Sequence, residues 1–83
     1  MVYEQFWIVK KSNDRHFLIK LGTKLKSLRL QANFTQEQLA NEIGVEISQI
    51  SRIERGLIAT SVVTFYDISI ALNIPLSAFF NLD

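Results

Sequence analysis

The sequence predicts an all-α protein of five helices arranged in one small domain. Apolar residues recur at intervals of three and four along most of the chain, which is the spacing of one buried helix face. Gly44, Gly56 and Pro75 fall between these segments, where helices end. The alternation typical of a strand occurs only weakly, at Tyr3–Val9. With 83 residues, of which 48% are hydrophobic and 20% charged, the chain can bury one core but not two.

The first helix is expected over residues 14–31, with Ser12 or Asn13 as its N-terminal cap. Its apolar stripe consists of four leucines, Leu18, Leu21, Leu25 and Leu28. Residues 1–13 precede it as an arm of aromatic and basic residues, which we expect to be extended or strand-like. The domain itself is therefore expected to cover residues 14–83.

Two short helices follow, over residues 36–43 and about residues 46–55. Thr35, followed three residues later by a glutamine, is the capping-box pattern that begins a helix. Gly44 suits the left-handed residue that ends a helix, because it has no Cβ to clash. Two helices joined by a glycine turn in this way form a helix-turn-helix motif, here residues 36–55.

A fourth helix is expected over residues 61–72, with Thr60 or Ser61 as its cap. Its inward residues are Phe65, Ile68, Ala71 and Leu72. Pro75 suits the first turn of a fifth, short helix that ends near Phe80, because the first turn leaves its N–H groups without partners.

The third helix carries an outward face that can form hydrogen bonds. At about 100° per residue, this face lies opposite the apolar edge formed by Ile50 and Ile53. Together with its flanks it consists of Ile47, Ser48, Gln49, Ser51, Arg52 and Arg55. Hydroxyls, an amide and guanidiniums suit the base edges of a major groove, which is wide enough for one helix. Gln36 and the amides at the start of the preceding helix suit a phosphate.

The segment from Thr35 to Gly56, TQEQLANEIGVEISQISRIERG, resembles the helix-turn-helix of phage repressors and Cro, the XRE-like family of bacterial transcription regulators. The resemblance extends over about residues 16–80. The residues that stand where the pattern expects them are Gln36, Leu39, Ala40, Gly44, Val45, Ile50, Ser51, Ile53, Glu54 and Gly56. The resemblance implies a phage-repressor-like DNA-binding domain that recognises a specific double-stranded DNA sequence, as a small regulator and most often a repressor.

The same resemblance implies that the recognition helix, about residues 46–55, enters the major groove of an operator. The DNA-binding residues that it implies are Thr35, Gln36, Ile47, Ser48, Gln49, Ser51, Arg52 and Arg55. Arg29 and Glu54 match a buried salt bridge of relatives and are expected to be structural. The chain departs from the pattern at Glu46, whose carboxylate would repel a phosphate, and at Ile47, which offers only apolar contact.

Charge is unevenly distributed along the chain. Residues 1–34 carry seven Lys and Arg against two Asp and Glu, a balance of +5, whereas residues 35–83 carry two against six, a balance of −4. The net charge is only +1, yet such a dipolar chain can present one basic face to a polyanion. Phosphate attraction is expected to come mainly from the basic residues between positions 10 and 29.

Apolar residues exceed what one small core needs, and the surplus lies at Val62, Tyr66, Ile70, Phe79 and Phe80. We therefore expect a homodimer, which would read a palindromic operator through two half-sites. An alternative remains open: an antitoxin-like or other protein-interaction module, which binds its partner through the aromatic arm and the C-terminal phenylalanines. The chain could also be the DNA-binding end of a longer regulator.

Several classes of site are not expected. The absence of cysteine and the single histidine exclude a disulfide framework, a thiol nucleophile and an ordinary zinc site. No glycine-rich phosphate loop or paired-carboxylate pattern occurs, so we expect no enzyme, no cofactor and no small-molecule ligand. No apolar run approaches the roughly 20 residues that span a bilayer, and we expect a cytoplasmic protein without a membrane partner.

Overall fold

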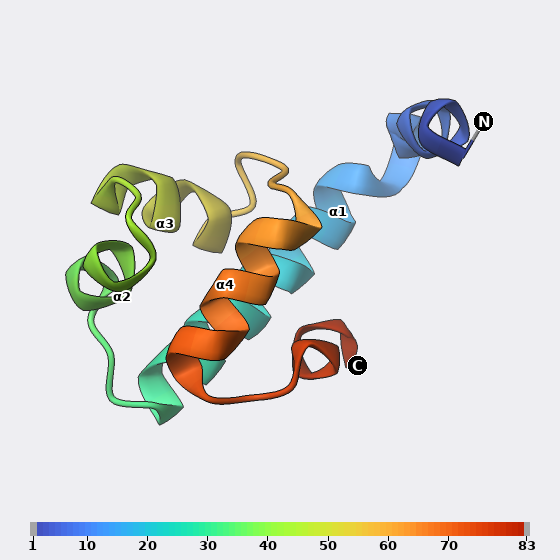
Figure 1. The fold of residues 1–83 in the computed structure, drawn as a ribbon. Coiled ribbons are helices and arrows are strands. Elements are labelled where there is room, and N and C mark those ends of the chain that lie inside the picture. The colour runs from blue at the N-terminus through green and yellow to red at the C-terminus, as the bar shows by residue number, and fades with distance from the viewer. Residues whose placement is uncertain (1, 83) are drawn as a thin grey trace.

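The computed structural model describes the backbone of residues 2–82 and the side chains of residues 15–82. Its elements are α1 (Val2–Gln31), α2 (Gln36–Ile43), α3 (Ile47–Glu54), α4 (Val62–Leu72) and the 3₁₀ helix η1 (Leu76–Phe80). No strand occurs in the backbone of residues 2–82, which confirms the all-α class. Figure 1 shows α2 and α3 as neighbours, with α4 in front of α1 in this view.

The first helix is longer than predicted. It spans Val2–Gln31, so the start predicted at Asp14 and the extended or strand-like arm were both wrong. Ser12 and Asn13, predicted as caps, lie within its bounds. Neither residue stops a helix, because each lowers helix propensity by less than about 1 kcal/mol relative to alanine.

A domain boundary between residues 1–13 and residues 14–83 remains a prediction. The outermost residues of these two ranges, Met1 and Asp83, lie outside the described part of the chain.

The fifth, short helix that was predicted is a 3₁₀ helix, so residues 2–82 contain four α-helices and not the predicted bundle of five. Asn73 ends α4 in the left-handed conformation, with φ of 58°. Pro75 then adopts an extended conformation as the N-cap of η1, one residue before the first turn in which it was predicted. This helix has five residues, and 3₁₀ geometry is typical of such short segments.

The core is formed where all these elements meet. Its buried apolar residues are Leu21, Leu25, Leu39, Ala40, Ile50, Ile53, Phe65, Ile68, Leu72 and Phe79. Leu28 packs against this cluster as a partly buried residue, in line with the predicted stripe. Phe79 was expected to add surplus apolar surface, and this was wrong: it is fully buried and packs edge-on against Phe65, with ring centroids 5.1 Å apart.

Helix α1 meets α3 at Gly22. A Cβ atom at this position would lie 2.3 Å from the carbonyl oxygen of Ile53 and 2.5 Å from that of Glu54. These distances are far below van der Waals contact, so only glycine permits this approach. The close approach sets the position of the C-terminal end of α3, which carries Glu54.

Candidate nucleic-acid interface

The N-terminus of α2 begins with a capping box. Thr35 Oγ1 accepts a hydrogen bond from the Gln38 amide at 3.0 Å, and Gln38 Oε1 accepts one from the Thr35 amide at 2.9 Å. The predicted capping box is therefore confirmed. The amides of Gln36 and Glu37 have no partner among the hydrogen bonds of the described residues. Two backbone donors are thus left at the positive end of the helix, where an anion can bind.

The turn between α2 and α3 is built on Gly44. Its φ is 76°, the left-handed conformation that the sequence predicted, and its amide donates to the carbonyl of Ala40. Val45 packs against the core as a partly buried residue. Glu46 is the N-cap of α3 and makes no side-chain capping bond, and the helix itself begins at Ile47.

The outward face of α3 is as polar as the helical wheel predicted. Ile50 and Ile53 are buried, whereas Ser48 and Arg52 are exposed and Gln49 is half-buried. Ile47 is also exposed, to 47% of its full area. Ser48 and Arg52 thus lie on the side of α3 opposite the core, with Ile47 and Gln49 on its flanks.

Two of the predicted site residues on α3 contact one another. Arg55 is the C-cap of α3, and its Nε donates to the carbonyl of Ser51 at 3.3 Å and to Ser51 Oγ at 3.2 Å. Its side chain therefore folds back along the helix surface. Ser51 is half-buried and Arg55 exposed, so of this pair the guanidinium is the group more accessible to a ligand.

A buried ion pair joins α1 to α3. Arg29 Nε donates to Glu54 Oε2 at 2.6 Å, and Arg29 Nη2 donates to Glu54 Oε1 at 3.1 Å. Arg29 Nη1 also donates to the carbonyl of Phe34 at 2.7 Å, in the loop before α2. The guanidinium therefore holds together α1, this loop and the end of α3.

Gln36 joins this network. Its Nε2 donates to Glu54 Oε1 at 3.0 Å, and its side chain is half-buried. Sequence reasoning missed this contact because the two residues are 18 positions apart on different helices. A predicted DNA-binding residue is thus linked directly to the predicted structural pair.

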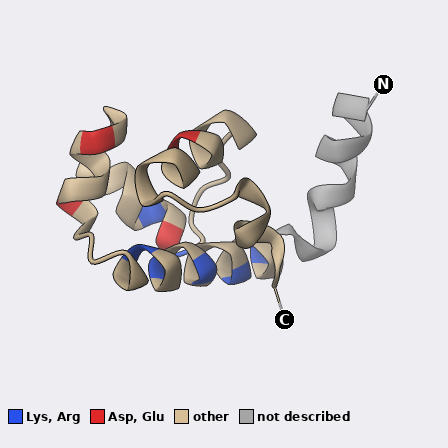
Figure 2. Cartoon of the chain, turned by 60° about the horizontal axis from the view of Figure 1, so that its bottom comes forward, with Lys and Arg blue, Asp and Glu red and all other residues tan. Residues whose placement is uncertain are grey.

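Figure 2 shows basic residues recurring along α1 and acidic residues on the later helices, as the sequence predicted. Within α1 the basic side chains do not share one side. Arg15 lies seven residues before Gly22 and Lys26 four after it, so both are on the side that meets α3. Both are exposed. Arg29 is buried in its ion pair.

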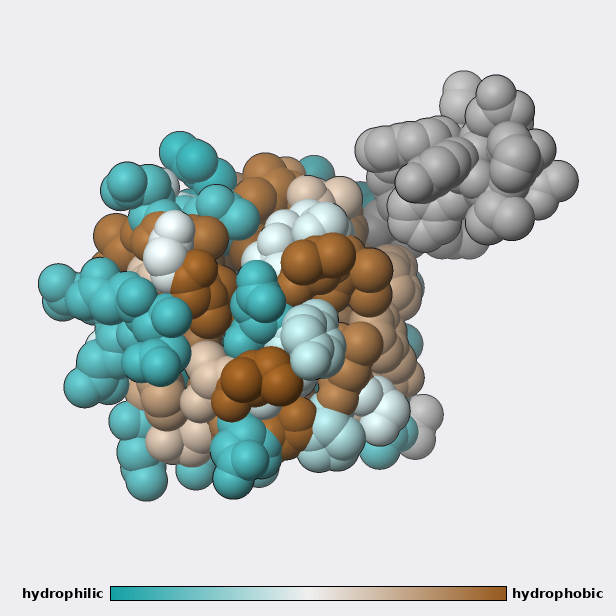
Figure 3. Space-filling model, viewed as in Figure 1, coloured by the Kyte–Doolittle hydropathy of each residue, from teal (hydrophilic) through white to brown (hydrophobic). Residues whose placement is uncertain are grey.

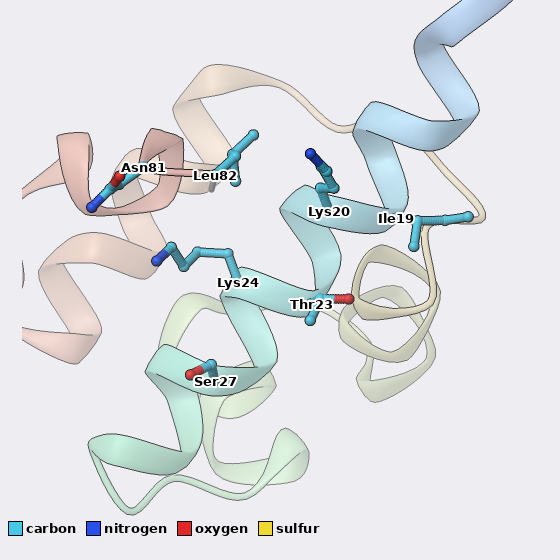
Figure 4. Close-up of a pocket in the computed structure, with 7 residues that line it drawn as sticks. All are labelled: Ile19, Lys20, Thr23, Lys24, Ser27, Asn81 and Leu82. Atoms are coloured by element: carbon cyan, nitrogen blue, oxygen red, sulfur yellow. The ribbon is translucent and has the colours of Figure 1, made fainter.

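Lys20 and Lys24 lie on another side of α1 (Figure 4). They line a shallow hollow of about 340 Å³ beside Asn81 and Leu82, at the C-terminal end of the described chain. The remaining lining residues are Ile19, Thr23 and Ser27. These two lysines are therefore separated from the side of α1 that meets α3, where Arg15 and Lys26 lie. Lys10 and Lys11, which belong to the same predicted basic set, have side chains outside the described residues.

Helix α4 has an exposed apolar face, which consists of Val62, Val63, Tyr66 and Ile70. These side chains are between 53% and 63% exposed. In Figure 3, brown apolar residues lie along α4, with teal and pale residues between them. Contiguous exposed apolar surface of this kind is typical of sites that contact another protein.

Within residues 15–82, no three His, Asp or Glu side chains cluster in a way that could hold a metal ion. None of the helices described has the length and apolar character needed to cross a bilayer.

Protein-family models and curated proteins match a part of the chain that includes the whole helix-turn-helix motif. A family model described as helix-turn-helix matches residues 25–79. The chain is 36% identical over 66 residues to an uncharacterized transcriptional regulator in the ATPase CF(0) region of Rhodospirillum rubrum, covering 80% of this chain and 61% of that protein. It is 37% identical over 59 residues to the HTH-type transcriptional regulator SutR of Escherichia coli K12, covering 71% of this chain and 33% of that protein. The chain thus spans only part of these relatives.

Solved structures give the same result. The restriction-modification controller protein C.AhdI from Aeromonas hydrophila superposes with a TM-score of 0.76 at 32% identity, covering 78% of this chain and 98% of that one. A transcriptional regulator of the HTH_3 family from Vibrio cholerae gives a TM-score of 0.76 at 30% identity, covering 84% and 39%. With its capping box, its glycine turn and the polar outward face of α3 in place, the chain belongs to the XRE-type helix-turn-helix family of DNA-binding transcription regulators.

Proposed function

We propose that this chain binds a specific double-stranded operator as a small transcriptional regulator, with α3 in the major groove, and represses by occupying that site. The observation that carries the proposal is the outward face of α3. This face is lined with hydroxyl, amide and guanidinium groups, while the opposite face is buried in the core. A helix held rigidly by one face and polar on the other meets the requirements of a groove reader.

The proposal gives each residue a role. Ser48, Gln49 and Arg52 read base edges, and the exposed Ile47 contacts a thymine methyl group. The free amides of Gln36 and Glu37 bind a phosphate at the N-terminus of α2.

Three further residues act at the margins of the interface. Arg55 contacts a second phosphate. Thr35 fixes α2 through its capping hydroxyl, and Ser51 orients Arg55 through their hydrogen bond.

We further propose that the regulator acts as a homodimer that buries the apolar face of α4. A two-fold axis would then present two α3 helices to a palindromic operator, with half-sites about one helical turn apart. Support comes from the exposed Val62, Val63, Tyr66 and Ile70, which no described residue covers.

Selection from a random pool of double-stranded DNA tests the proposal. The enriched duplex should be palindromic, and the purified chain should bind it at least about 1,000-fold more tightly than scrambled DNA at near-physiological salt. A folded chain that enriches no sequence would contradict the proposal. That result would favour a protein-interaction module, with the apolar face of α4 as the first surface to examine.

A further inference from the structure

The carboxylate of Glu54 accepts three hydrogen bonds, and one of them comes from a residue of the proposed DNA interface. Arg29 supplies two donors, Nε at 2.6 Å and Nη2 at 3.1 Å, and Gln36 Nε2 supplies the third at 3.0 Å. The side chain of Glu54 is only 2% exposed. It is therefore fixed in position, and it in turn restricts the side chain of Gln36.

The chemistry of the two groups fixes which way the Gln36 amide faces. A carboxylate paired with a guanidinium can only accept hydrogen bonds, so Gln36 must turn its NH₂ group toward Glu54. The reverse orientation would place two acceptor oxygens 3.0 Å apart with no proton between them. The Oε1 of Gln36 consequently lies on the side of the amide away from Glu54.

We propose that Glu54 is a positioning residue for DNA recognition, which holds Gln36 so that its oxygen selects a base with an exocyclic amino group. Adenine N6 and cytosine N4 donate hydrogen bonds in the major groove, whereas guanine O6 and thymine O4 only accept them. A phosphate also only accepts, so it pairs with the free amides of Gln36 and Glu37 and leaves the side-chain oxygen for a base. This inference rests on the proposed function.

Base substitution in the enriched operator tests the inference. Each base pair is replaced in turn, and the competition of each duplex for the wild-type chain is measured. At one position, adenine or cytosine on the contacted strand should be preferred over guanine or thymine by at least about 5-fold.

Two variants then separate positioning from simple contact. Glu54→Asp keeps the negative charge beside Arg29 but is one methylene shorter, which lengthens the bonds of the shared carboxylate oxygen to both Gln36 and Arg29. Gln36→Lys keeps a donor for Glu54 but removes the outward oxygen. Each should reduce the preference at that one position to less than about 2-fold and leave the preferences at other positions unchanged. Glu42→Asp, an exposed carboxylate of α2, is the matched control and should change none of them.

The outcomes distinguish the inference from the proposed function. If wild type enriches no site, both are overturned. If wild type enriches a site and the folded variants keep its full base preference, only the inference is overturned. Should Glu54→Asp fail to fold, hydrogen exchange with solvent is measured for the side-chain NH₂ groups of the wild-type chain. A hydrogen bond to Glu54 must make the NH₂ group of Gln36 exchange several-fold more slowly than that of Gln49. Equal exchange rates would overturn the inference.

Discussion

Helices α3 and α4 both bury one apolar face in the same core, yet their outward faces differ in chemistry. The outward face of α3 has hydroxyl, amide and guanidinium groups, and that of α4 has Val62, Val63, Tyr66 and Ile70. Burial explains the inward faces of both helices equally well. The outward faces carry the functional information, because polar groups suit base edges whereas exposed apolar side chains suit another protein surface.

The two helices also differ in how they are anchored. The end of α3 is held by charged and amide groups, through the network of Glu54 with Arg29 and Gln36. Helix α4 is held mainly by packing, with Phe65 against Phe79 and, at 6.5 Å, Phe80. A hydrogen-bonded ion pair such as Glu54 with Arg29, here called the polar anchor, needs both partners. Single substitutions should therefore lower stability differently at the end of α3 and in α4.

The largest effect is expected when the polar anchor loses its carboxylate. Glu54→Ala leaves Arg29 buried without its counter-charge and should lower the free energy of unfolding by about 3–5 kcal/mol. Urea unfolding followed by circular dichroism measures the loss. Glu42→Ala removes an exposed carboxylate and should change stability by less than about 0.5 kcal/mol. Similar losses in both variants would show that the ion pair does not anchor α3.

A charge on the outward face of α4 should break the proposed dimer without unfolding the chain. Ile70 is 63% exposed, so Ile70→Lys removes apolar burial of roughly 1–2 kcal/mol from each of two copies. Sedimentation equilibrium should show a monomer at concentrations where wild type is dimeric, with an unchanged unfolding transition. Lys24→Ala, in the hollow beside Asn81 and Leu82 and outside this face, serves as the control. A dimer that survives Ile70→Lys would require a different interface.

Removal of the guanidinium from the α3 face should weaken specific binding alone. Arg52→Ala is expected to cost about 1–3 kcal/mol in operator affinity and to leave binding to scrambled DNA nearly unchanged. Lys26→Ala, on the α1 side that meets α3, should instead weaken binding to all sequences. It should also reduce the slope of the logarithm of the binding constant against the logarithm of the salt concentration by about 1. If the folded Arg52→Ala chain binds its operator as tightly as wild type, the reading face has been assigned to the wrong residues.

The smallest effect compares the two helix caps. Thr35 Oγ1 caps α2 through Gln38, and Ser61 Oγ caps α4 through Thr64 at 3.1 Å. Substitution of either residue by alanine should lower the free energy of unfolding by about 1 kcal/mol. Only Thr35→Ala should also weaken operator binding, because the amides that it orders face the proposed phosphate. Equal effects of both substitutions on operator binding would remove α2 from the interface.

Much of the helix-turn-helix could be predicted because its signals are local. The capping box at Thr35 and the left-handed Gly44 each depend on residues within a few positions. The polar face of α3 follows from helical periodicity alone. The start of α1 was predicted wrongly for a related reason. Ser12 and Asn13 are compatible with a cap and with a helix interior, so local preference could not choose between them.

Local signals thus defined the class of fold, the positions of α2 to α4 and the polar outward face of α3. They could not reveal that Gly22 lies against the end of α3, or that Gln36 donates to Glu54. The burial of Phe79 and the separation of Lys20 and Lys24 from the α3 side were equally hidden. Each of these depends on the angle and distance at which distant helices meet. Those quantities arise from packing of the whole core and leave no trace in the spacing of neighbouring residues.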